Sequence, residues 1–168
     1  HLLVTASIGN LRYTKKGRLM SDAITADDLA VLTQWDTPTI CNALEEIVPE
    51  RRGHGFTTQH LFALDSSLPP VCGFARTATI RAAEPPRETA AQMAAKRTAY
   101  YEFVAAGPMP TIAVIQDLDP VPGIGAFWGE VQTTVHKGLG VVGAVTNGSF
   151  RDVPDSARGF QLIGGKVG

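Results

Sequence analysis

The chain has 168 residues, 44% of them hydrophobic and 18% charged, and its formal net charge is −1. This length and balance suit one domain with a buried core and exclude a disordered chain. The near-neutral charge gives no electrostatic basis for binding nucleic acid or a membrane surface. No apolar run approaches the roughly 18–20 residues that cross a bilayer. We therefore expect a cytoplasmic protein with neither nucleic acid nor a membrane as its partner.

The N-terminal segment looks unlike the rest of the chain. Residues 1–19 end in a basic stretch before Met20, and their apolar start lacks the basic lead of a signal peptide. We interpret residues 1–19 as an N-terminal extension, Met20 as the natural start, and residues 20–168 as a single domain.

The two cysteines, Cys41 and Cys72, lie far apart and form no C-x-x-C motif. We expect two buried free thiols in a reducing cytosol rather than a disulfide.

Two helices are predicted near the start of this domain. Thr25 and Asp28 form a capping-box pattern, so one helix should run from there to about Gln34. Its expected apolar contacts are Leu29, Val31 and Leu32. Thr37 as N-cap, followed by Pro38, predicts a second helix that ends before Pro49. The residues expected on its buried face are Ile40, Cys41, Ala43, Leu44 and Ile47.

The rest of the chain alternates between strand and helix patterns. Residues 49–70 read as a loop with at most a little strand. Strands are predicted over 71–81, 111–116, 141–146 and 160–163, helices over 88–106 and 130–137, and a single helical turn over 154–158. This alternation is typical of the α/β class.

The stretch 129–155 reads GEVQTTVHKGLGVVGAVTNGSFRDVPD and carries the strongest functional signal. Twenty residues separate Glu130 from the pair Arg151-Asp152, and Asp155 follows shortly after. One helix, one turn and one strand should bring the chain back to where the stretch begins. Two or three carboxylates and a guanidinium would then lie beside a helix N-terminus. Carboxylates suit a hard divalent cation, and the guanidinium and free N–H groups suit a small anion.

The sequence gives weaker support for a dinucleotide-binding loop or a serine nucleophile. Gly138, Gly140 and Gly143 match the pattern G-x-G-x-x-G. They follow a predicted helix and precede a predicted strand, whereas a dinucleotide-binding turn follows a strand and precedes a helix. We interpret them as a glycine-rich helix-to-strand connection. Ser149 has no G-x-S-x-G context and no obvious base.

The histidines and lysines also favour structural roles. His54, His60 and His136 match no zinc spacing, so they are interpreted as surface or packing residues. Lys137 ends a predicted helix, where a cation offsets the helix dipole, and is a poor candidate for a Schiff-base lysine.

The pattern Glu130-x20-Arg151-Asp152-x2-Asp155 resembles the acid-x20-Arg-Asp-x2-acid signature of the RraA-like family. The segments TPTICNALEE and GFARTATI extend the resemblance from about Asp27 to the end of the chain. The family includes metal-dependent 4-hydroxy-4-methyl-2-oxoglutarate aldolases that also decarboxylate oxaloacetate. It also includes regulators of ribonuclease E activity.

This resemblance implies a fold, an assembly and a site. The fold would be an α/β/β-sandwich swivelling domain, and the assembly a homotrimer or a dimer of trimers with active sites between subunits. Asp152 would be the direct ligand of Mg²⁺, Mn²⁺ or another divalent cation, Glu130 would hold metal-bound waters, and Asp155 would be the last acid of the pattern. Arg151 would bind the 2-oxo acid substrate. The backbone N–H groups of Val131 and Gln132 would hold its carboxylate.

The activity implied is that of a divalent-metal-dependent lyase. Retro-aldol cleavage and β-decarboxylation both leave a pyruvate enolate, which a metal ion acting as a Lewis acid stabilises. The alternative is a non-catalytic regulator that binds a protein partner such as an endoribonuclease. The sequence departs from the family pattern in having Glu130 where the characterised aldolases have Asp, and Thr146-Asn147-Gly148 where Asp-Gly is frequent. Family chains usually extend further, so we expect this chain to lack the usual C-terminal part of the domain.

Overall fold

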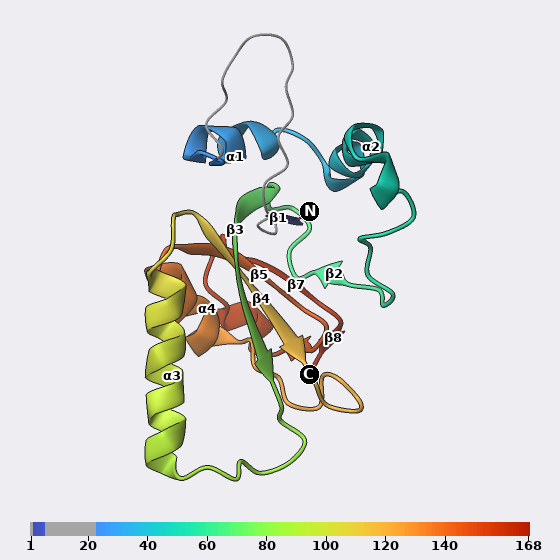
Figure 1. Cartoon of the computed structure of the whole chain (residues 1–168). Coiled ribbons are helices and arrows are strands. Elements are labelled where there is room, and N and C mark those ends of the chain that lie inside the picture. Colours follow the sequence, from blue (N-terminus) through green and yellow to red (C-terminus); the bar gives the residue numbers. More distant parts are fainter. Residues whose placement is uncertain (1, 6–22) are drawn as a thin grey trace.

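The computed structural model describes residues 2–5 and 23–168, and its centre is a six-stranded sheet (Figure 1). The strands follow the order β1-β3-β4-β5-β7-β2, and only the β2–β7 pair is antiparallel. Their bounds are β1 (Leu2–Thr5), β2 (Phe62–Ala63), β3 (Val71–Ile80), β4 (Thr111–Asp117), β5 (Val141–Thr146) and β7 (Gln161–Gly164). Two further strands, β6 (Ser149–Phe150) and β8 (Lys166–Val167), form a small parallel sheet.

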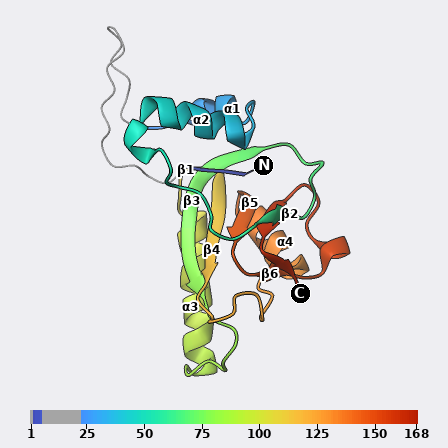
Figure 2. The same cartoon turned by 90° about the vertical axis from the view of Figure 1, so that its right-hand side faces the viewer.

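Two helices connect the central parallel strands and cover one face of the sheet. Helix α3 (Ala90–Ala105) joins β3 to β4, and α4 (Glu130–Gly138) precedes β5. Parallel neighbours need such crossover connections, because a short hairpin can only reverse the chain. The main core lies between these helices and the sheet (Figures 1 and 2). Its buried residues include Val104, Ala113, Ile115, Trp128, Ala144, Phe150 and Leu162. The predicted α/β class is therefore confirmed.

Local sequence explains where α3 begins. Thr89 caps the helix, with its hydroxyl accepting from the backbone N–H of Gln92 at 3.3 Å. The side-chain oxygen of Gln92 accepts the N–H of Thr89 at 2.9 Å in return. This reciprocal capping box satisfies two donors that the helix itself leaves unpaired, so the helix begins at Ala90, two residues later than the predicted start at residue 88.

The N-terminal helices are α1 (Ala26–Leu32) and α2 (Thr37–Ile47), followed by the 3-10 turn η1 (Pro49–Arg51). The capping box of α1 is present as predicted, but α2 is capped by Asp36 and not by Thr37. The carboxylate of Asp36 accepts the backbone N–H of Thr39 at 2.9 Å, which moves the helix start by one residue.

The prediction of a buried face on α2 is wrong. None of its residues is fully buried, and of the predicted face only Ile40 is even half-buried, against the small cluster of Leu29 and Cys72. The apolar side of the helix is left open because α2 lies beyond the end of the main sheet (Figure 1). Val31 of α1 is likewise exposed, whereas Leu29 is buried as expected.

Both cysteines are free, as predicted, but only Cys72 is buried. Burial raises the pKa of the Cys72 thiol by disfavouring the thiolate. Cys41 is exposed because it lies on the open side of α2, so the expectation of two buried thiols is wrong for that residue.

The N-terminal segment contributes one strand to the sheet. Residues Leu2–Thr5 form β1, which pairs in parallel with Val71–Phe74 of β3. Met20, interpreted as the natural start, lies outside the described residues. Within residues 2–5 and 23–168, no helix has the length and apolar character needed to cross a bilayer.

Candidate functional site

The chain returns to the start of α4 as the 20-residue spacing predicts. The backbone N–H of Arg151 donates to the carbonyl of Trp128 at 2.8 Å, and Trp128 and Phe150 form a parallel bridge. Next to this bridge, Asp152 lies over Gly129. A Cβ placed on Gly129 would be only 2.5 Å from Oδ2 of Asp152. The absence of a side chain at Gly129 therefore lets the carboxylate reach the helix start.

The first turn of α4 presents unpaired backbone donors at the same place. Gly129 is the N-cap and offers no side chain to accept from them. The N–H groups of Glu130, Val131 and Gln132 fall in the first turn, where no intrahelical acceptor exists. Together with the helix dipole they favour an anion or a carboxylate at this end. The side chain of Val131 is 66% exposed, so solvent reaches this turn.

Asp152 adopts a left-handed backbone conformation, with φ 53° and ψ 42°. It is the only non-glycine residue with positive φ in the described part of the chain. Aspartate and asparagine tolerate this region better than other residues that carry a Cβ. The turn is closed by the carbonyl of Asp152, which accepts from the N–H of Asp155 at 3.0 Å and from the hydroxyl of Ser156 at 3.2 Å. Strained conformations of this kind concentrate at functional sites.

Arg151 lies beside this carboxylate and is mostly open to solvent. Its Nε is 3.6 Å from Oδ2 of Asp152, and the two side chains are 65% and 43% exposed. An exposed pair of this kind contributes little to folding stability. The guanidinium is instead free to contact an anion bound next to Asp152.

Glu130 and Asp155 are also exposed near the turn, but the acids do not form a complete ligand cage. Among the described residues, no group of three or more His, Cys, Asp or Glu side chains is arranged to hold a metal ion. The oxygen donors still fit Mg²⁺, which keeps several waters and is commonly held by one or two carboxylates.

The connection from β4 to α4 is fixed by two buried acids that the sequence reading missed. The carboxylate of Asp117 accepts the N–H groups of Asp119 and Gly123 at 2.9 and 2.7 Å. The carboxylate of Asp119 accepts from Ala82 and Ala83 at 2.9 and 2.8 Å. These hydrogen bonds fix the loop between β4 and α4, and this loop leads to Gly129. The run of Asp, Pro and Gly in the loop was a usable signal for such turns.

A buried polar network between α3 and α4 was also missed. His136 is fully buried, and its Nδ1–H donates to the carbonyl of Gln132 at 2.7 Å. Its Nε2 then accepts from the hydroxyl of Tyr100, also at 2.7 Å. The hydroxyl of Tyr101 donates to Oε1 of Gln132 at 3.2 Å. Burial raises the pKa of Tyr100, which keeps its hydroxyl protonated as the donor. The network secures the first turn of α4 against α3.

His136 should make stability pH-dependent. Its pKa lies below the ordinary 6.5 because burial disfavours the charged imidazolium. Below about pH 6.5 the unfolded chain binds a proton that the folded protein does not, so the free energy of unfolding falls by up to about 1.4 kcal/mol per pH unit. Urea unfolding at several pH values should show this slope for the parent and a flatter one for His136→Gln. The same substitution at the exposed His60 should leave the slope unchanged; equal slopes in all three proteins would contradict the assignment.

Gly129→Ala should damage the site more than the fold. The backbone of Gly129 is extended, a conformation open to any residue, so the new Cβ clashes mainly with Asp152. The carboxylate must move away from the helix start. We therefore expect metal affinity to fall by about 10-fold or more, which is the effect of substituting residues that orient metal ligands. Mn²⁺ titration followed by electron paramagnetic resonance measures this. Gly138→Ala is the matched control, since a Cβ there meets nothing within 4 Å.

The structure also places the glycines, the lysine and the histidines of the weaker interpretations. Gly138 ends α4 and Gly143 lies within β5, which confirms a glycine-rich helix-to-strand connection. The ammonium of Lys137 donates to the carbonyl of Arg158, so this lysine is tied to the surface. His54 and His60 are exposed, and His136 is a packing residue, as predicted.

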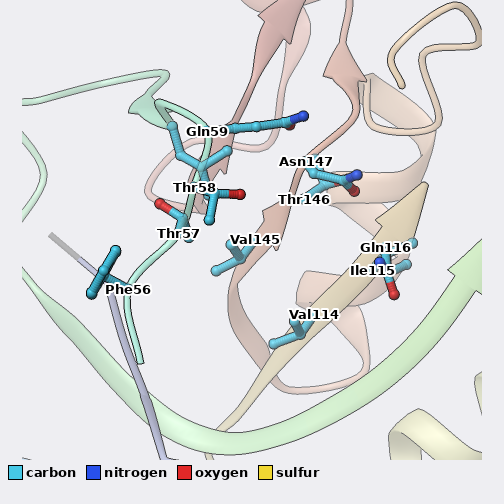
Figure 3. A pocket seen from close by; sticks show the side chains of 11 residues that line it. Phe56, Thr57, Thr58, Gln59, Val114, Ile115, Gln116, Val145, Thr146 and Asn147 are labelled. Carbon is cyan, nitrogen blue, oxygen red and sulfur yellow. The ribbon is translucent and has the colours of Figure 1, made fainter. Parts of the chain in front are cut away.

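A cavity lies elsewhere, on the sheet face that α3 and α4 leave open. It has a volume of about 470 Å³ and lies between the loop before β2 and the strands β4 and β5 (Figure 3). None of the predicted site residues lines it, and neither does any acidic or basic side chain. We therefore take the start of α4, and not this cavity, as the candidate site. The lining residues are Phe56, Thr57, Thr58, Gln59, Leu61, Val114, Ile115, Gln116, Val145, Thr146 and Asn147.

Comparison with known proteins gives a family and a related fold. A model of the RraA-like family, described as Aldolase/RraA, matches residues 37–161. No curated protein matches the chain. A solved structure titled "Crystal structure of novel cellulases from microbes associated with the gut ecosystem" is similar, with 18% identity and a TM-score of 0.61. The match covers 90% of this chain but only 62% of that one. At this identity the likeness shows the fold alone.

Proposed function

The chain belongs to the RraA-like family, and on this premise we propose that it is a divalent-metal-dependent lyase acting on small 2-oxo acids. Its reactions would be retro-aldol cleavage of substrates like 4-hydroxy-4-methyl-2-oxoglutarate, decarboxylation of oxaloacetate, or both. The observation that carries the proposal is the position of Asp152. Its carboxylate lies against Gly129, the N-cap of α4, and its Oδ2 is 3.6 Å from Nε of Arg151.

Each residue of the site has a role in this proposal. Asp152 binds the cation directly, Glu130 orients waters around it, and Asp155 contributes a further acid from the same turn. The bound cation supplies Lewis acidity toward the 2-oxo group. The backbone N–H groups of Val131 and Gln132 hold the substrate carboxylate. Arg151 offsets the negative charge that develops on the 2-oxo oxygen when the C3–C4 bond breaks.

The protein is further proposed to work as a homotrimer or a dimer of trimers in the cytoplasm. Two observations support an assembly. The acids of one chain leave the ligand set incomplete among the described residues, and the apolar side chains of Val131 and Val153 are exposed next to the site. Light scattering at micromolar concentration should give at least three times the 17.9 kDa mass of one chain. A mass of one chain would refute the assembly.

A decarboxylation assay tests the activity directly. Oxaloacetate loss should be fast with protein and Mg²⁺ or Mn²⁺, should stop with chelator, and should return when the metal is restored. Metal without protein is the essential blank, because divalent cations decarboxylate oxaloacetate slowly by themselves. Borohydride reduction with pyruvate should leave no adduct, and Lys137→Ala should keep full turnover.

Two outcomes would change the proposal. An adduct on Lys137 would establish a Schiff-base mechanism instead. A wild-type protein that binds no metal and turns over neither substrate would favour the family's other activity, regulation of a protein partner such as an endoribonuclease.

A further inference from the structure

We propose that Thr133 is a positioning residue that fixes the two halves of the candidate site relative to each other. One half is the first turn of α4, and the other is the turn that carries Arg151, Asp152 and Asp155. The inference rests on the function proposed above. Thr133 itself touches neither metal nor substrate in this proposal, because its side chain is fully buried.

The hydroxyl of Thr133 bonds to both halves at once. It donates to the carbonyl of Gly129 at 2.8 Å and approaches that of Glu130 at 3.1 Å. Threonine commonly bonds backward within a helix in this way. The same oxygen also accepts the backbone N–H of Ala157 at 2.9 Å, across 24 residues of sequence. That third contact is not part of any helix pattern.

Both contacts lie next to the groups proposed to do the chemistry. Gly129 packs against the carboxylate of Asp152, and Ala157 follows the turn that the carbonyl of Asp152 closes through Asp155 and Ser156. The hydroxyl therefore sets how far the acid turn lies from the free N–H groups of α4. A catalytic site depends on such distances, since a displacement of about 1 Å can cost on the order of 100-fold in rate.

The test compares Thr133→Val, which keeps the shape and loses the hydroxyl, with Thr133→Ser, which keeps the hydroxyl. We expect Thr133→Val to lower kcat for oxaloacetate by about 10- to 100-fold and to weaken Mn²⁺ binding. The amide of Ala157 should exchange with solvent faster. Thr133→Ser should stay within about 3-fold of the parent, because the bonding oxygen remains. Thr134→Val is the matched control, since Thr134 is the exposed next residue of the same helix.

Several results would overturn the proposal. If Thr133→Val speeds Ala157 exchange but keeps turnover and Mn²⁺ affinity, the hydroxyl serves stability alone. If Thr133→Ser fails as badly as Thr133→Val, the methyl group and not the hydroxyl is responsible. Should Thr133→Val not fold, Thr133→Ala repeats the comparison with a better helix former. A parent protein that binds Mn²⁺ without turnover refutes the lyase function but leaves the affinity comparison decisive for Thr133. A parent protein that does not bind Mn²⁺ refutes both the lyase function and the positioning role of Thr133.

Discussion

Asp152→Asn should lower metal affinity by at least about 100-fold and abolish turnover. Even substitutions of residues that only orient a metal ligand lower metal affinity or activity by about 10- to 100-fold. The substitution removes the charge that holds the cation and keeps the shape of the side chain. Asparagine also tolerates the left-handed backbone of residue 152, so the melting temperature without metal should match that of the parent. Alanine is the poorer choice here, because it would add strain of about 1–2 kcal/mol in that conformation.

Calorimetric titration with Mn²⁺, run beside the decarboxylation assay, measures both losses. Asp27→Asn is the matched control, because Asp27 is an exposed acid in the first turn of α1. Asp155→Asn adds a graded comparison, since its effect shows whether the last acid of the pattern binds the cation. If Asp152→Asn binds Mn²⁺ as tightly as the parent, the assignment of Asp152 as the direct ligand is wrong.

Arg151→Ala should fail in a different way. The guanidinium is not a metal ligand, so metal affinity should persist, whereas kcat should fall by about 10²–10³, or roughly 3–4 kcal/mol in the barrier. The reason is the loss of a fixed positive charge beside the substrate oxygen that becomes negative. Arg151→Lys should restore little, because an ammonium cannot make the planar two-point contact of a guanidinium.

The measurement is kcat and KM for each variant together with Mn²⁺ affinity and melting temperature. Arg158→Ala is the control, since it removes an exposed arginine from the same segment. The pair Arg151–Asp152 is largely exposed, so breaking it should hardly affect folding. If the variants at both positions unfold, the pair is a structural turn and not a functional site.

The sequence by itself determined the order and type of most elements and the spacing of the site. The apolar patterns of residues 111–116 and 141–146 predict strands that the structure has as β4 and β5, because period and propensity are local properties. The spacing between Glu130 and Arg151 predicted a return of the chain that the structure confirms. One helix and one strand of known length leave little choice of where the next turn can lie.

Only the tertiary structure decided which side chains are buried and how the site is held. Helix α2 has a clear apolar side, yet burial requires a second surface, and no described element supplies one there. The contact of Gly129 with Asp152 and the bond from Ala157 to Thr133 join residues more than 20 positions apart. Such contacts depend on how whole elements pack, and no pattern within a few neighbouring residues encodes them.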